Sequence, residues 1–281
     1  MSTLRVTAYT ALTMIAFAAN SLLCRLALKN TSIDAASFST VRILSGAMML
    51  WLVMRWRDSS SSKQSTWHGA AALFVYVAAF SFAYLSLSAG TGTLLLFGAV
   101  QTTMILAGFI AGERVNKLQG AGFIAALAGL VILVLPSVAT PTLTGSVLMI
   151  ASGIAWGLYS LFGRNVADPI AATAGNFLRA IPFTIALSLF ALPWMKLDVT
   201  GLLYATLSGA LTSGLGYVLW YRILRDTHII TVATAQLSVP VLAALGGVIW
   251  LSEVLSQNLL IASVLILGGV GLVLRFGKMR I

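Results

Sequence analysis

Long apolar stretches separated by short polar ones make up almost the whole chain. A helix needs about 20 mostly apolar residues to cross a bilayer, and ten such stretches follow one another. The pattern predicts helices over residues 7–28, 34–54, 68–88, 91–112, 118–135, 143–165, 170–192, 200–222, 228–251 and 256–275. The longest polar run, residues 55–67, is too short to fold alone. We therefore expect an all-α membrane protein with ten transmembrane helices.

The pattern occurs twice along the chain. Residues 17–25 (FAANSLLCR) align with residues 156–164 (WGLYSLFGR), and residues 91–135 align with residues 231–275. In each copy an apolar helix ends at a lone glutamate, Glu113 or Glu253. Because each copy holds an odd number of helices, the second enters the membrane from the opposite side. The sequence thus predicts two inverted five-helix repeats, residues 1–137 and 138–281, with a substrate site at their interface.

Composition and charge agree with a membrane location. Hydrophobic residues make up 59% of the chain and charged residues only 9%, against about 25% charged residues in soluble domains. The net charge of +10 could indicate nucleic-acid binding, but the basic residues are distributed unevenly. With a cytoplasmic N-terminus, 12 of the 17 lysines and arginines lie inside, 3 outside and 2 within helices. This positive-inside bias predicts a multi-pass membrane protein with both termini cytoplasmic, in contact with lipid and not with nucleic acid.

The chemistry indicates neither an enzyme nor an ion-coupled carrier. No cluster of His, Cys, Asp and Glu has metal-ligand spacing, and no Gly-rich nucleotide loop is present, so we expect no catalysis, metal or cofactor. All seven acids fall at helix ends or in loops. Proton-coupled carriers usually keep an acid or a histidine deep in the bilayer, so the sequence favours transport without ion coupling.

Two arginines, Arg42 and Arg179, fall within predicted helices at related places in the two repeats. A buried guanidinium could bind a substrate carboxylate. The alternative is that each side chain snorkels to the membrane surface or caps a neighbouring helix. We favour the structural interpretation for both.

Aromatic and amide side chains are better candidates for a binding site. Tyr76, Phe80 and Tyr84 share one helix face, and Trp156 lies near the middle of its helix beside glycines. Polar groups within helices should face the bundle interior. The predicted substrate-binding residues are Trp156, Tyr159, Phe80, Tyr84, Gln101, Asn20, Tyr217 and Gln236.

Each candidate has a structural alternative. The aromatic stripe of Tyr76, Phe80 and Tyr84 could be ordinary core packing, and Gln101 and Gln236 could form hydrogen bonds between helices. Tryptophans near helix ends are typical of the interfacial belt, which we expect for Trp51, Trp56, Trp67, Trp194, Trp220 and Trp250.

Several motifs carry a resemblance to a known family. They are ATAQLSVP (residues 233–240), WLSE (250–253) and LGGVGL (267–272), with AGE (111–113) and AGLVIL (128–133) in the first copy. With these, the chain resembles bacterial drug/metabolite transporter superfamily proteins of the EamA type, and among them the YddG-like amino-acid exporters. The resemblance implies a ten-helix basket, a cavity lined mainly by helices 1, 3, 4, 6, 8 and 9, and alternating access. The proline usual in the fourth helix is replaced by Val100, whereas its counterpart Pro240 is kept.

With this resemblance we expect an exporter of amino acids, aromatic and other apolar ones, that lies in the bacterial inner membrane and works as a uniporter. The alternatives are an exporter of other small metabolites, such as nucleosides or drug-like cations, and a membrane scaffold that transports nothing. The sequence does not define an oligomeric state, and a monomer is compatible with it.

Overall fold

The computed structural model describes residues 3–56, 65–87, 89–134, 142–164, 166–251 and 257–276. Within these ranges the chain is nearly all helical and has no β-strand. The first half contains α1 (Thr3–Asn30), α2 (Ala35–Trp56), α3 (Trp67–Ala83), α4 (Ala89–Ile110) and α5 (Lys117–Val134). The second half contains α6 (Leu143–Arg164), α7 (Pro169–Ala191), η2 (Leu192–Trp194), α8 (Val199–Leu207), η3 (Ser208–Leu215), α9 (Gly216–Asp226), α10 (Ile229–Gln236), α11 (Ser238–Leu251) and α12 (Gln257–Phe276).

Six described stretches are long and apolar enough to cross a membrane. They are Arg5–Asn30, Ala35–Trp56, Leu143–Arg164, Pro169–Trp194, Val199–Arg225 and Ile229–Gly246. The shorter apolar helices are Trp67–Ala83, Leu95–Ile110, Lys117–Ile132 and Leu260–Phe276. The expectation of an all-α membrane protein is confirmed.

Local side-chain caps fix the start of several helices. Asp34 accepts from the backbone amides of Ala36 and Ser37 at 2.9 Å and so begins α2. Asp168 caps α7 and Asp198 caps α8 in the same way. A cap of this kind stabilises a helix by about 0.5–2 kcal/mol. Capping is therefore the physical reason why these acids lie at helix ends.

Two of the predicted helices are interrupted near their middle. In η3, a π-helical segment between α8 and α9, the amide of Gly216 donates to the carbonyl of Leu211, five residues earlier. α10 ends at Gln236, because Pro240 has no N–H to donate to the Gln236 carbonyl. α4 has Val100 at the corresponding place and continues through it.

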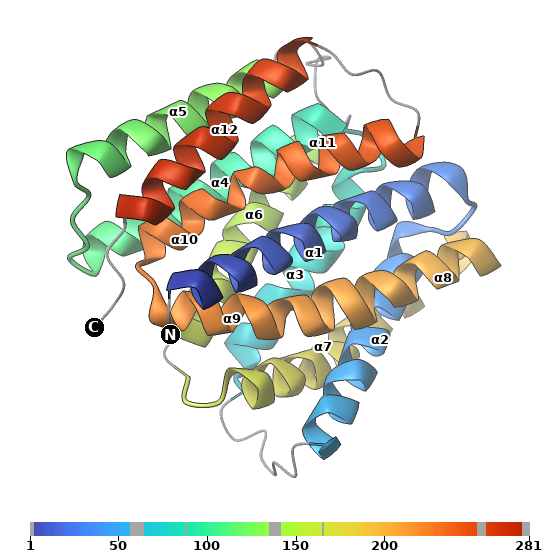
Figure 1. The fold of residues 1–281 in the computed structure, drawn as a ribbon. Coiled ribbons are helices and arrows are strands. Elements are labelled where there is room, and N and C mark those ends of the chain that lie inside the picture. Colours follow the sequence, from blue (N-terminus) through green and yellow to red (C-terminus); the bar gives the residue numbers. More distant parts are fainter. Residues whose placement is uncertain are drawn as a thin grey trace.

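The helices pack in pairs (Figure 1). α5 lies against α12 along one edge of the molecule, and α2 lies against α7. α6 contacts α3 and α4, while α1 contacts α8, η3, α9 and α11. α5 and α12 can approach closely because Gly122 has no side chain: a Cβ at this position would lie only 2.7 Å from the Gly269 carbonyl oxygen. The start of α1 and the end of α12 lie at the same end of the bundle.

Candidate functional site

A cluster of aromatic side chains surrounds Trp156 in the middle of α6. Trp156 is only 5% exposed. Five rings have their centroids within 6.0 Å of its own: Phe17, Tyr76, Tyr159, Tyr217 and Trp220. They come from α1, α3, α6 and α9, so helices from both halves of the chain meet here. We call these six residues the Trp156 cluster.

Two glutamines add buried polar groups next to this cluster. Trp156 Nε1 donates to Gln236 Oε1 at 2.8 Å, and Gln236 Nε2 donates to Met104 Sδ at 3.2 Å. Gln101 Nε2 donates to the Ala233 carbonyl at 2.6 Å. Both glutamines therefore bond across helices, joining α4, α6 and α10. The Gln101 Oε1 atom is buried and has no hydrogen-bond partner among the described residues.

Arg42 of α2 is fully buried beside the cluster. Its Nε donates to Ser213 Oγ at 3.0 Å, and its Nη2 donates to the Tyr76 and Tyr217 hydroxyls at 3.2 and 3.1 Å. The guanidinium carbon also lies 5.2 Å from the Tyr76 ring centroid. The expectation that Arg42 snorkels or caps a helix is wrong, because its guanidinium is held by side chains inside the bundle.

Two glycines explain how α2 comes this close to η3. A Cβ at Gly209 would clash with the backbone of Arg42 and with the side chain of Ser45. A Cβ at Gly46 would lie 3.1 Å from the Gly209 carbonyl. The absence of side chains at both positions lets the π-helical segment present Ser213 to Arg42.

The predicted binding residues fall into a central and a peripheral group. Trp156, Tyr159 and Tyr217 belong to the Trp156 cluster, and Gln236 is bonded to it. Phe80 reaches the cluster through Tyr76, whose ring centroid is 5.9 Å away.

Two other candidates, Tyr84 and Asn20, do not belong to the Trp156 cluster. Tyr84 stacks edge-on against Phe80 at 4.8 Å. Asn20 Oδ1 accepts from the Ser208 hydroxyl at 2.7 Å and from the Thr212 hydroxyl at 3.2 Å, which ties α1 to α8 and η3. Asn20 therefore has a structural contact that the sequence did not indicate.

The expectation of an interfacial position is wrong for Trp220. It was assigned to the interfacial belt, but it is fully buried and its Nε1 donates to Ser160 Oγ at 2.9 Å. A signal was available, since Tyr217, Trp220 and Tyr221 share one face of α9 and the exposed Arg222 lies on another. The exposed tryptophans match the belt expectation: Trp51, Trp56, Trp67 and Trp194. The side chain of Trp250 lies outside the described residues.

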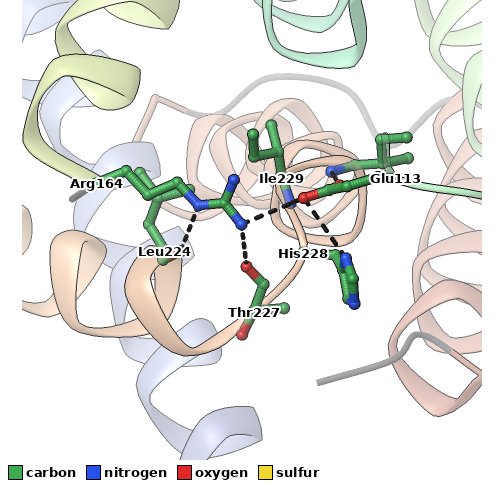
Figure 2. A network of polar contacts seen from close by, with 7 residues as sticks. Glu113, Arg164, Leu224, Thr227, His228 and Ile229 are labelled. Carbon is green, nitrogen blue, oxygen red and sulfur yellow. Dashed lines mark hydrogen bonds and ion pairs between the residues drawn. The ribbon is translucent and has the colours of Figure 1, made fainter. Parts of the chain in front are cut away.

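A second polar site begins where α4 ends (Figure 2). Gly112, with φ of 79°, turns the chain out of the helix. The Glu113 carboxylate then accepts from the backbone amides of Ile229 and Ile230 at 2.8 and 3.0 Å. α10 is thus capped by a residue more than 100 positions away in sequence. A carboxylate at this place also interacts favourably with the helix dipole.

Two basic side chains approach the same carboxylate. Arg164, the last residue of α6, lies 3.2 Å from Glu113 Oε1 and also donates to the carbonyls of Leu224 and Thr227. His228 Nδ1 lies 3.5 Å from the same oxygen. The side chains of Arg164 and Glu113 are 7% and 8% exposed. We call Glu113, Arg164 and His228 the Glu113 network.

The Glu113 network joins the ends of α4, α6 and α9 to the start of α10. It lies at the end of the bundle where α1 begins. Arg164 follows Trp156 by eight positions in α6, which corresponds to about 12 Å along the helix axis. The corresponding glutamate of the second copy, Glu253, lies outside the described residues.

Comparison with known proteins identifies relatives over nearly the whole chain. The sequence profile of the EamA-like transporter family matches residues 5–135 and again residues 143–275. A Pseudomonas aeruginosa protein of uncharacterised function is 53% identical over 96% of this chain and 95% of its own. A Salmonella typhimurium protein named "Probable amino-acid metabolite efflux pump" is 24% identical over 64% of this chain and 66% of its own.

Two further comparisons extend this result. A Streptantibioticus cattleyicolor protein named "Probable terminal-alkyne amino-acid exporter" is 26% identical over 74% of this chain and 71% of its own. One crystal structure superposes with a TM-score of 0.78 and 22% identity, covering 95% of this chain and 98% of that one. At this identity the superposition supports the fold alone.

Proposed function

The chain belongs to the EamA-like transporter family, and we propose that it exports amino acids, aromatic and other apolar ones, across the bacterial inner membrane. The observation that carries this proposal is the Trp156 cluster, an aromatic surface buried where both halves of the chain meet. Aromatic rings offer stacking and apolar area to an amino-acid side chain. Gln101 Oε1 is a buried acceptor for an ammonium group. The printed names of two relatives support the same substrate class.

The architecture that we propose is ten transmembrane helices in two inverted repeats, residues 1–137 and 138–281. The family profile matches once in each half. The helix packing also has the pairing that a two-fold axis requires. The corresponding helices α5 and α12 pack against each other, and so do α2 and α7. The contact of α6 with α3 has its counterpart in the contact of α1 with α8 and α9. The uneven distribution of basic residues supports cytoplasmic termini.

The positions of the Trp156 cluster and the Glu113 network support a mechanism of alternating access. The Trp156 cluster lies midway along α6, and the Glu113 network ties four helix ends together at the end of the bundle that we assign to the cytoplasm. Rocking of the two halves would open this end and expose the cluster to cytoplasmic substrate. The breaks at η3 and between α10 and α11 lie beside the cluster and provide places for the helices to bend.

We propose uniport because the four acids whose side-chain contacts the structure describes have structural partners. Asp34, Asp168 and Asp198 cap helices, and Glu113 is paired at a helix end. Within the described part of the chain, no acid lies in the middle of a helix, where a proton-coupled carrier usually keeps one.

The test is uptake of labelled tryptophan, threonine and nucleosides into liposomes that contain the purified protein. We expect tryptophan to be transported in preference to nucleosides. Preferred transport of nucleosides would point to a different metabolite, and no transport of any solute would support a scaffold.

A matched pair of tryptophan variants tests the site. Loss of the packed Trp156 ring should weaken aromatic substrate binding by about 1 kcal/mol or more, so Trp156→Ala should raise the half-saturating tryptophan concentration at least about fivefold. Trp67→Ala is the control, because Trp67 is 58% exposed. Both variants are compared at equal amounts of folded protein. Normal transport by Trp156→Ala, or equal losses in both variants, would refute the site.

A further inference from the structure

Arg42 is a buried cation without an acidic partner among the described residues. A guanidinium has five N–H donors. Nε and Nη2 use theirs on Ser213, Tyr76 and Tyr217, whereas Nη1 is buried and has no hydrogen-bond partner in the part of the chain that the structure describes. Charged groups in the middle of a membrane protein are costly and usually serve function. The cost here is only partly offset by neutral hydroxyls.

The groups that hold Arg42 are suited to an anion. The hydroxyl oxygens of Ser213, Tyr76 and Tyr217 accept from the guanidinium. The Tyr76 and Tyr217 hydroxyls therefore each keep a proton of their own to donate. A positive charge ringed by hydroxyl donors complements a negatively charged group with several acceptor lone pairs. A carboxylate meets this requirement, and Arg is the residue that matches its geometry best.

We propose that Arg42 binds the carboxylate of the substrate, assisted by the hydroxyls of Tyr76 and Tyr217. This assignment rests on the proposed amino-acid transport. The same two tyrosines connect the cation to the aromatic site: their rings lie 5.0 and 4.8 Å from the ring of Trp156. A ligand with a carboxylate close to an apolar side chain would thus contact Arg42 and the Trp156 cluster together.

Binding of four related ligands tests the assignment on the full-length protein in detergent. The ligands are labelled tryptophan, tryptophanamide, tryptamine and indole-3-propionate, measured by equilibrium dialysis. The first and last carry a carboxylate, and the other two keep the indole without it. We expect the wild-type protein to bind tryptophan roughly 10- to 100-fold more tightly than tryptophanamide, the range for hydrogen bonds to charged groups.

Arg42→Gln should remove this preference. Its affinity for tryptophan should fall by roughly 10- to 100-fold, while its affinity for tryptophanamide should stay within about twofold. A purely structural Arg42 predicts equal losses for both ligands, and that result would overturn the proposal. Arg179→Gln is the control, because Arg179 lies in α7 against the ring of Trp67, away from the cluster. It should leave the preference intact.

Milder variants keep the test valid if Arg42→Gln does not fold. Arg42→Lys retains the charge and should keep part of the preference. Tyr217→Phe removes one donor and should weaken binding of the carboxylates alone, by roughly 3- to 10-fold. If neither variant changes the ratio of tryptophan to tryptophanamide affinity, Arg42 is not the carboxylate site.

The panel also separates this proposal from the proposed function. Arg42-dependent binding of indole-3-propionate without any tryptophan transport would support the carboxylate site and refute amino-acid export. Tryptophan transport with equal affinity for acid and amide would support export and refute the carboxylate site.

Discussion

Replacing Glu113 with glutamine removes one charge and one acceptor from the Glu113 network while keeping its shape. The Glu113 carboxylate accepts from two backbone amides of α10 and from Arg164. A glutamine has a single acceptor oxygen, so at least one amide of α10 would face an NH₂ group. Arg164, whose side chain is only 7% exposed, would lose its ion pair with Glu113. Because removal of one partner from a buried ion pair costs about 3–5 kcal/mol, we expect Glu113→Gln to lower the free energy of unfolding by about 3 kcal/mol.

Two assays measure this change. Denaturation in detergent micelles reports the loss of stability. Accessibility of a cysteine introduced by Thr231→Cys reports opening of the Glu113 end, since Thr231 is buried in the first turn of α10 and its hydroxyl has no hydrogen-bond partner among the described residues. The background carries Cys24→Ala, because Cys24 is the one native cysteine. Glu113→Gln should make the introduced cysteine react faster with a membrane-impermeant reagent.

The control is the double variant Glu113→Gln with Arg164→Met. It removes both members of the ion pair, so it should cost less than the sum of the two single changes. If Glu113→Gln changes stability by less than about 0.5 kcal/mol and leaves the cysteine unreactive, the network does not hold this end closed.

Two further predictions concern the ends of the bundle. Burial raises the pKa of Asp34, but hydrogen bonds from Ser37, Lys196 and Ala36 outweigh it and hold the pKa below its usual value. A carboxyl whose pKa is lower in the folded than in the unfolded protein stabilises the fold at pH values above its unfolded-state pKa, which is about 3.9 for aspartate. This stabilisation is lost as the pH falls through the folded-state pKa. Thermal stability should thus fall below about pH 4, and Asp34→Asn should flatten that decline; an equally steep decline in the variant would contradict the assignment. For topology, cysteines placed by Lys117→Cys and Thr142→Cys should react from the cytoplasmic and outer sides respectively, and labelling from one side only would refute the proposed orientation.

The helices were predictable because apolar length and local caps specify them. The run of apolar residues sets each span, and residues such as Asp168 followed by Pro169 mark a helix start within the sequence. The interruption before Pro240 could also be inferred from the sequence, since proline has no backbone N–H to donate to the preceding turn. The π-helical segment was not predicted, because no residue pattern in this stretch distinguishes it from an α-helix, and the contact of Gly209 with α2 appears only in the structure.

The binding candidates were predictable in type but not in arrangement. Trp156 stood out through its position in the middle of a helix, where the interfacial belt does not explain a tryptophan. Arg42 was misjudged because the sequence does not show which way a side chain points. Its guanidinium is held by Ser213 and Tyr217, about 170 residues away along the chain. Long-range contacts of this kind also hide the role of Glu113 at the start of α10.

Counterflow of labelled tryptophan tests the central claim most directly. Liposomes containing the purified protein are loaded with unlabelled tryptophan, at equal pH and equal sodium on both sides, and diluted into labelled tryptophan. Alternating access around the Trp156 cluster predicts transient accumulation of label without any ion gradient, weakened in Trp156→Ala and kept in Trp67→Ala. Accumulation that occurs only under an imposed pH or sodium step, or no accumulation at all, would contradict uniport of amino acids.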